Sequence, residues 1–127
     1  MPTLLREGDV FVLRLGAGEN RFDEAQVAAL ERALDDVEAS SGLAGLVTIG
    51  EGRFFSNGLD LDWLMGPGAA RAREFVGRLQ ELFARWLTTG VPTVAALNGH
   101  AFAAGAMFAF AHDYRVMRAD RGFLCIN

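Results

Sequence analysis

Two short segments of the 127-residue sequence place glycine among polar and small residues in a spacing that could support chemistry. Residues 54–61 tighten at Gly58, and a glycine lets the backbone turn sharply and lets a ligand approach the chain closely. Residues 98–106 begin with an Asn-Gly turn and run into small residues that predict a helix from about Ala104. A helix N-terminus offers free backbone N–H groups to an anion. Two N–H groups that converge from these loops would form an oxyanion hole, and two tight strand-to-helix turns are the structural alternative.

A glycine pair near the N-terminus favours a different chemistry only weakly. Gly16 and Gly18 follow a β-rich run, as in the dinucleotide-binding pattern G-x-G-x-x-G, but Arg21 occupies the position of the third glycine. No acidic residue is clearly placed at the end of a strand about 20 residues further on, where that fold needs one. The pair therefore indicates an ordinary turn between a strand and a helix.

Ser56, His112 and Asp113 are the residues that could suggest a hydrolase triad. The pattern G-x-S-x-G is absent around Ser56, and the adjacent side chains of His112 and Asp113 should diverge instead of forming a relay. His100, His112 and Cys125 match no common zinc spacing, so no metal site is predicted. His100 either lines a pocket or completes the hydrogen bonds of its loop.

The composition indicates an ordinary globular protein, with 51% hydrophobic and 22% charged residues. The net charge of −4 gives no basic surface for a nucleic acid, so no nucleic-acid partner is expected. The single cysteine excludes an intrachain disulfide and fits a reducing compartment, so we expect a cytoplasmic location. Neither a signal peptide nor an apolar run long enough to cross a membrane is present, and no membrane partner is expected.

The pattern of apolar residues predicts an α/β protein. Asp23 and Gln26 resemble a capping box at the start of a helix that ends near Ser40. The run 43–49 is expected to be a strand buried on both faces, and strand–helix–strand order implies parallel pairing. The other expected elements are strands at 10–15, 93–97 and 114–117, a helix over 71–87, and a further strand beginning at 122. That final apolar run has no polar tail, which predicts a domain that continues beyond Asn127.

Residues 55–61 read F-S-x-G-x-D-L, and residues 96–105 read A-x-N-G-x-A-x-x-x-G. With the helix and strand between them, these paired motifs resemble the signatures of the crotonase (enoyl-CoA hydratase/isomerase) superfamily. The resemblance implies an α/β spiral of ββα units, in which residues 1–127 form the core and the chain stops before the C-terminal helices. It also implies an acyl-CoA substrate, no cofactor other than the coenzyme A of that substrate, and a homotrimer or hexamer.

The resemblance implies that the backbone N–H groups of Leu59 and Ala104 form the oxyanion hole. It places the remaining substrate-binding positions on three loops, of which the first runs near the coenzyme A. These positions are Asn20, Arg21, Phe55, Ser56, Asn57, Gly58, Leu61, Ala103 and Gly105. Arg21 could contact a phosphate through charge-assisted hydrogen bonds, or it could be a solvated surface residue.

The departures from the family pattern favour an isomerase over a hydratase. The hydratases carry a glutamate two residues after the last glycine of the second motif, and Met107 stands there in this sequence. Because hydration needs positioned acid–base groups, Met107 removes the two-glutamate mechanism. In the Δ3,Δ2-enoyl-CoA isomerases the catalytic glutamate lies about twenty residues downstream, at Asn127 or just beyond it. The sequence of residues 56–61, followed by Trp63, is also more similar to that of these isomerases.

Two alternatives remain open at this point. The chain could be a non-catalytic acyl-CoA binder or a remnant, in which case Phe75, Leu79, Trp86 and the last strand should expose apolar surface because the covering helices are missing. A serine protease relative of the Clp type shares the spiral fold. Its serine and histidine would stand near Ala104 and Tyr114, which cannot perform that chemistry.

Overall fold

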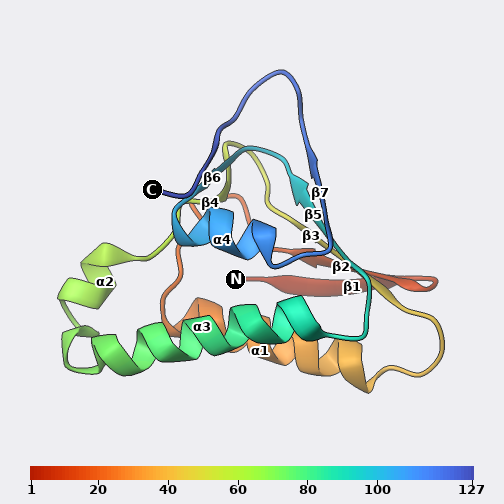
Figure 1. Cartoon of the computed structure of the whole chain (residues 1–127), viewed down its shortest axis with the longest axis horizontal. Coiled ribbons are helices and arrows are strands. Elements are labelled where there is room, and N and C mark those ends of the chain that lie inside the picture. The colour runs from red at the N-terminus through yellow and green to blue at the C-terminus, as the bar shows by residue number, and fades with distance from the viewer.

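The computed structural model describes all 127 residues as a succession of ββα units (Figure 1). The first unit contains β1 (Thr3–Glu7), β2 (Val10–Arg14) and α1 (Glu24–Ala39), and the second contains β3 (Gly45–Ile49), β4 (Phe54–Ser56), α2 (Leu61–Met65), the short 3₁₀ helix η1 (Ala69–Arg71) and α3 (Ala72–Thr88). The third contains β5 (Thr93–Leu97), β6 (His100–Phe102) and α4 (Ala104–Phe110), and it is followed by β7 (Tyr114–Met117) and β8 (Leu124–Cys125). The expected repetition of ββα units is present.

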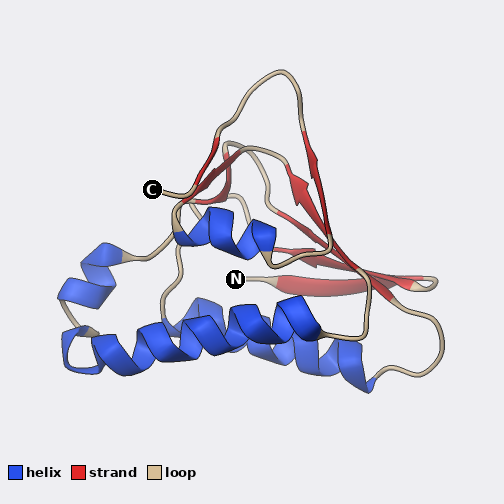
Figure 2. Cartoon of the chain, in the orientation of Figure 1, coloured by secondary structure: helices blue, strands red, loops and turns tan.

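The strands are divided between two sheets (Figure 2). The main sheet has the order β1-β2-β3-β5-β7, in which β1 and β2 are antiparallel and all later pairs are parallel. The small sheet has the order β4-β6-β8 and is entirely parallel. From the second unit on, the first strand of each unit joins the main sheet and the next strand joins the small one. The chain therefore winds forward as a spiral.

Helices α1 and α3 lie side by side below the sheets (Figure 1). Asp23 caps α1, because its side chain accepts a hydrogen bond of 2.7 Å from the N–H of Gln26. This confirms the predicted start of the helix. Arginines at the start and along the length of α3 pair with acidic residues of α1. These pairs are Arg71–Glu24, Arg78–Glu31, Arg85–Asp35 and Arg85–Glu38.

Phe108 of α4 lies at the centre of the core, fully buried. Its ring makes an edge contact with Trp86 of α3 at a centroid distance of 4.9 Å and packs against Phe83 at 5.6 Å. Trp86 is only 1% exposed, and Phe75 and Leu79 are 4% and 5% exposed. The expectation of exposed apolar surface is therefore wrong for these three residues, because Trp63 of α2 and Phe108 of α4 pack against this face of α3. It holds for the last strand, where Phe123 and Leu124 are 69% and 37% exposed.

The structure also corrects the expected strands. The second predicted strand begins at Gly45, and only Leu46 and Thr48 on its inner face are buried. Val47 and Ile49 on the other face are partly exposed, so the strand is not buried on both faces. Strands β1, β4 and β6 were not predicted, and the last predicted strand is limited to Leu124–Cys125.

Candidate active site

The two glycine segments meet at the carboxyl ends of β4 and β6. These strands are neighbours and run parallel, so the loops that follow them emerge at the same edge of the small sheet. Gly58 has a φ of 88°, in the region that favours glycine. A Cβ added to Gly58 would lie 3.0 Å from the carbonyl oxygen of Phe102 and 3.4 Å from the backbone nitrogen of Ala104. The first loop therefore passes directly beside the start of α4.

A short parallel bridge orients the N–H of Leu59. The N–H of Phe22 donates to the carbonyl oxygen of Gly58 at 2.8 Å, and the N–H of Asp60 donates to the carbonyl oxygen of Phe22 at 3.0 Å. In an extended chain the polar groups of successive residues point to opposite sides, so the N–H of Leu59 points away from Phe22. It has no hydrogen-bond acceptor within the protein.

The N–H of Ala104 is available for a structural reason. Ala104 is the first residue of α4, and the first N–H groups of a helix have no acceptor within the helix. The preceding residue, Ala103, has no side-chain group that could cap them. Ala103 also has φ 49° and ψ −119°, a conformation that costs a non-glycine residue about 1–3 kcal/mol. This strained turn places α4 at the end of β6.

Gly105 lets α4 approach β4 more closely than any other residue would. A Cβ at this position would lie 2.3 Å from the carbonyl oxygen of Ser56, well inside contact distance. The Ser56 hydroxyl is fully buried and donates to the carbonyl oxygen of Asn20 at 2.8 Å. It also accepts a hydrogen bond of 3.2 Å from the N–H of Gly58. Ser56 thus joins β4 to the loop before α1 and to the Gly58 loop.

The loop before α1 is joined to β4 and to the residue after it by hydrogen bonds from one side-chain amide and one backbone N–H. Asn20 donates to the carbonyl oxygens of Gly16 at 3.1 Å and Phe55 at 3.0 Å, and the N–H of Asn57 donates to the carbonyl oxygen of Glu19 at 2.8 Å. Phe55 is 0% exposed, as is Ser56. In this structure these two side chains support the loop from inside, and they offer no surface to a ligand.

Arg21 lies next to the site but is surrounded by carboxylates. It forms ion pairs with Glu19, with Asp62 at 3.2 Å and with Asp60 at 3.9 Å. The hydrogen bond to Glu19, supported by the nearby negative charges, raises the pKa of the Arg21 guanidinium above its ordinary value. A phosphate would have to compete with these partners for Arg21. Leu61, at the start of α2, is 55% exposed and can contact a ligand.

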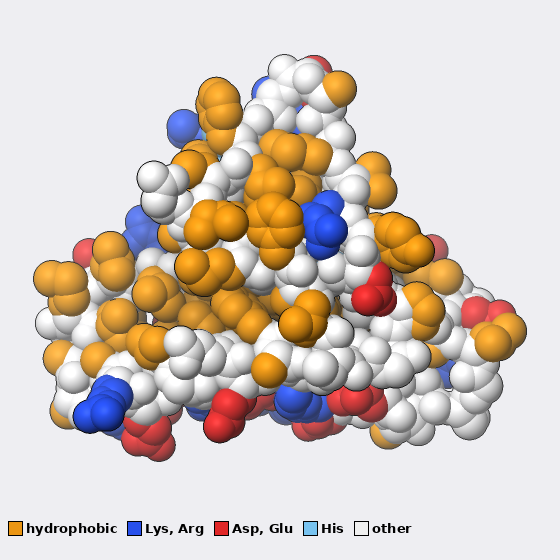
Figure 3. All heavy atoms as spheres, in the orientation of Figure 1, with side chains coloured by type: hydrophobic (Ala, Val, Ile, Leu, Met, Phe, Trp, Pro, Cys, Tyr) orange, Lys and Arg blue, Asp and Glu red, His pale blue; other side chains and the backbone are white.

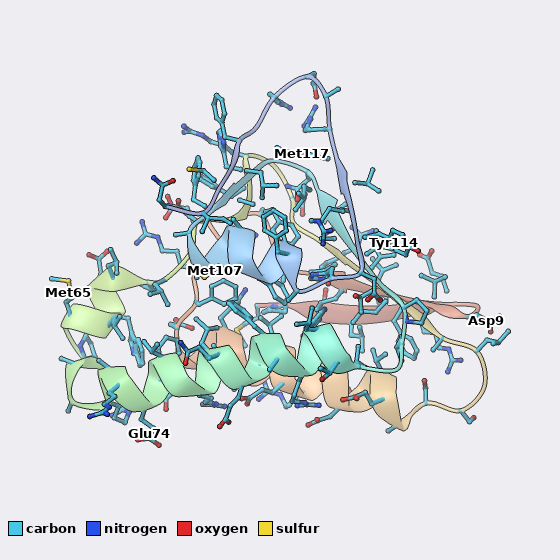
Figure 4. All side chains as sticks on the ribbon, in the orientation of Figure 1. Asp9, Met65, Glu74, Met107, Tyr114 and Met117 are labelled. Carbon is cyan, nitrogen blue, oxygen red and sulfur yellow. The ribbon has the colours of Figure 1, made fainter.

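The surface beside the two N–H groups is apolar. Met107 lies on α4 one turn after Ala104, and its side chain is 48% exposed (Figure 4). Figure 3 shows apolar side chains gathered over α4 and between α4 and α3. Asp60, the acid that directly follows Leu59, caps α2 by accepting a hydrogen bond of 3.1 Å from the N–H of Trp63. The site therefore combines backbone donors with an apolar wall.

The three residues considered for a hydrolase triad are not brought together. His112 is buried, donating to the carbonyl oxygen of Phe108 at 2.8 Å and accepting from the Thr48 hydroxyl at 2.8 Å. Burial lowers the pKa of His112 to about 4, so the ring is neutral at pH 7. Asp113 instead accepts from the N–H of Thr93 at 2.8 Å. With Ser56 held by Asn20, these residues form no triad.

Sequence reasoning missed the role of Asn98. Its side-chain oxygen accepts from the N–H of Gly50 at 2.9 Å, and its amide donates to the carbonyl oxygens of Gly52 and Phe54 at 3.2 and 3.1 Å. One side chain therefore joins the turn between β5 and β6 to the loop that precedes β4. The Asn-Gly motif predicted a turn at this position, but it gave no sign of the hydrogen bonds to residues 44–48 positions earlier in the chain.

The fold is that of an α/β protein in which the Gly58 loop meets the start of α4 beside an apolar surface, and each of these segments has a backbone N–H without an acceptor. Residues 7–124 match the family described as enoyl-CoA hydratase/isomerase. The chain is 43% identical over 132 residues to enoyl-CoA delta isomerase 3 of Arabidopsis thaliana, and 42% identical over 134 residues to the peroxisomal enoyl-CoA delta isomerase 2 of the same plant. Both matches cover 100% of this chain and 56% of the relative. The chain therefore belongs to the enoyl-CoA hydratase/isomerase, or crotonase, family.

The solved structures give the same family. A structure of an enoyl-CoA hydratase/isomerase family protein from Silicibacter pomeroyi matches with a TM-score of 0.87 and 27% identity. The match covers 95% of this chain and 53% of that protein, so the chain spans about half the length of its relatives. The expected crotonase-like spiral is confirmed. Helices long and apolar enough to span a membrane are absent from the structure.

Proposed function

We propose that this chain binds acyl-CoA thioesters, and that the N–H groups of Leu59 and Ala104 form an oxyanion hole for the thioester oxygen. The observation that supports the proposal is the contact between the Gly58 loop and the start of α4, where the N–H groups of Leu59 and Ala104 both lack an acceptor in the protein. Loss of one such donor typically costs about 3–4 kcal/mol of transition-state stabilisation. The exposed Leu61 and Met107 would lie against the acyl chain.

The reaction that we propose is the shift of a double bond from position 3 to position 2 of an enoyl-CoA. A base removes a proton from C2, the resulting dienolate places its negative charge on the thioester oxygen, and a proton returns at C4. The two N–H groups would stabilise that charge. Met107 supports this reaction over hydration, since an apolar side chain can neither activate water nor protonate carbon.

A second candidate function is acyl-CoA binding without catalysis. It is favoured by the absence of a free acid beside the two donors, where Asp60 is already engaged in capping α2. The base of the proposed isomerisation must therefore come from another part of the protein. Binding and turnover should accordingly be measured separately.

The oxyanion hole is tested by a matched pair of ligands. We expect butyryl-CoA to shift the amide signals of Leu59 and Ala104 in a ¹⁵N–¹H spectrum, because its carbonyl accepts both hydrogen bonds. The thioether S-butyl-CoA keeps the nucleotide and the alkyl chain but lacks the carbonyl, so it should leave these two signals nearly unchanged. Equal shifts with both ligands would refute the assignment of the donors.

The direction of the reaction is tested by turnover of 3-enoyl-CoA and 2-enoyl-CoA. Isomerisation of the first without hydration of the second would support an isomerase, and clean hydration would contradict it. Met107→Glu restores one of the two acids that a hydratase needs, so any hydration activity should rise in this variant. Binding of both substrates with no turnover of either would support the non-catalytic function.

The oligomeric state and the location are also proposals. A homotrimer or hexamer is consistent with exposed apolar residues such as Phe110, Tyr114 and Phe123, which are 45%, 68% and 69% exposed. Light scattering during gel filtration would give the mass. We propose the cytoplasm as the location, and the peroxisomal name of one relative makes the peroxisome the alternative that fractionation should distinguish.

A further inference from the structure

A polar pocket lies at the opposite end of the small sheet from the candidate active site. It has a volume of about 380 Å³, within the range of small-molecule sites, and no hydrophobic residue lines it. Its walls come from the loops that precede β4, β6 and β8, which meet because the three strands are parallel neighbours. The lining residues are Gly52, Arg53, Asn98, Gly99, His100, Arg121 and Gly122.

The pocket brings together two arginines that have no carboxylate partner. All twelve basic residues of the chain are arginine. The arginines whose side chains make neither an ion pair nor a hydrogen bond are Arg14, Arg32, Arg53, Arg73 and Arg121. Two of them, Arg53 and Arg121, line this one pocket. The neighbouring acid, Asp120, is paired with Arg118 at 2.6 Å, and the charge of Arg121 acts on it from a longer distance without forming an ion pair.

The acceptors around the pocket are largely engaged, whereas several donors are free. The carbonyl oxygens of Gly52 and Arg53 accept from Asn98 and from the N–H of His100. Nδ1 of His100 accepts from the N–H of Phe123 at 3.1 Å, which leaves the proton of the neutral ring on Nε2.

Two glycine amides add to these donors. The N–H groups of Gly99 and Gly122 have no acceptor in the protein, and the two residues are in contact. A Cβ on Gly122 would lie 3.1 Å from the carbonyl carbon of Gly99.

We infer that this pocket binds a phosphoryl group. Two guanidinium groups, an imidazole N–H and two glycine N–H groups form a set of donors that matches the several oxygens of a phosphate better than the two oxygens of a carboxylate. The pocket and the Gly58–Ala104 junction lie at opposite ends of β4 and β6, strands of three residues that each span about 10 Å. The phosphoryl group could belong to a small phosphorylated metabolite or to a coenzyme A.

The test is a titration of the ¹⁵N-labelled chain with sodium pyrophosphate at pH 8 and low ionic strength, against sodium chloride at matched ionic strength. We expect saturable shifts of the Gly99 and Gly122 amide signals with pyrophosphate alone. Arg53→Gln and Arg121→Gln should each weaken binding about tenfold, because each removes a charge-assisted contact. Arg73→Gln, which removes an unpaired arginine elsewhere, should change the affinity less than about twofold.

Unchanged amide signals outside the pocket would show that the variants fold, and Arg53→Lys provides a second variant that keeps the charge but loses the planar fork. Shifts that do not saturate, or an equal loss of affinity in Arg73→Gln, would overturn the inference. Addition of coenzyme A to the pyrophosphate-saturated protein identifies the source. Displacement of pyrophosphate would indicate the phosphates of coenzyme A, and simultaneous binding would indicate a separate phosphorylated ligand.

Discussion

The three parallel strands of the small sheet end in two regions of opposite chemistry. At their carboxyl ends, glycine and alanine bring backbone N–H groups to an apolar surface beside α4. At their amino ends, arginine side chains surround a polar pocket. The first region is built by close approach, such as that of Gly105 to Ser56, and the second by long side chains that extend into solvent.

The two regions should differ in their tolerance of substitution. A backbone donor cannot be adjusted without moving the strand or helix that carries it. A guanidinium on an exposed side chain can be removed while the fold remains intact. Substitutions at the carboxyl ends should therefore change both stability and binding, whereas those at the amino ends should change binding alone.

Gly105→Ala should have the largest effect. Its Cβ would lie 2.3 Å from a backbone oxygen, and overpacking against backbone costs about 3 kcal/mol or more. We expect urea unfolding to show this loss, and the butyryl-CoA response of Leu59 and Ala104 to disappear. Gly77→Ala is the control, because space is open there within α3 and the change should stabilise the protein by about 0.5–1 kcal/mol. Equal effects at both positions would remove the basis of the comparison.

Acid should destabilise the packing of α4 through His112, which joins the end of this helix to β3 of the main sheet. The ordinary pKa of 6.5 falls to about 4 in the folded protein, so between these values the unfolded chain binds a proton that the folded chain does not. Stability from this group is complete above pH 6.5 and decreases by up to about 3 kcal/mol as the pH falls to 4. Denaturation at a series of pH values would measure it.

His112→Gln is the control for that measurement. The variant should be less stable near neutral pH, but it should lose the part of the pH dependence that lies between 6.5 and 4. If wild type and variant have the same slope in this range, His112 is not the group responsible. Hydrogen exchange at low pH should then show whether α4 opens before the amino-end loops.

Ala103→Gly should increase stability by about 1 kcal/mol. The change relieves a positive φ that costs about 1–3 kcal/mol, and part of this gain is offset by the greater flexibility of glycine in the unfolded chain. Ala84→Gly, on the exposed face of the regular helix α3, should instead cost about 1 kcal/mol. A loss of stability in both variants would mean that Ala103 is not strained.

The amino-end substitution should have the smallest effect on the fold. Arg53 is exposed and has no ion pair, so Arg53→Gln should change the free energy of unfolding by less than about 0.5 kcal/mol. The same urea experiment measures it. A loss comparable to that of Gly105→Ala would show that both ends of the small sheet depend equally on packing.

The sequence predicted the elements that have a long periodic pattern. Helices α1 and α3 and strands β2, β3, β5 and β7 were found because their apolar residues recur over several positions. Strands β4 and β6 have only three residues, too few to show alternation. Strand β1 is mostly exposed, so it shows no apolar face. Two of the three strands of the small sheet were therefore missed, although this sheet carries both sites.

The candidate site was predicted from its glycines, but its supporting contacts were not. The motifs were visible because they require glycine. Gly58 has a positive φ, and Gly105 allows a close approach of α4 to β4 that a side chain would prevent. The hydrogen bond from Ser56 to Asn20 joins residues 36 positions apart, and no local pattern specifies it. The arginine pocket combines loops separated by more than 60 residues, so it became visible only once the strands were in place.

The ion pairs between α1 and α3 have a further consequence for how the spiral is aligned. The arginines at 71, 78 and 85 and the acids at 24, 31 and 38 recur at the same seven-residue interval and in the same direction. A slip of one helix by a single turn would break every pair. Only a slip of a full interval, about 10.5 Å, would re-form most of them. Each pair adds little stability at the surface. Together, however, they fix the axial register of α3 against α1, and so the position of one repeat relative to the next.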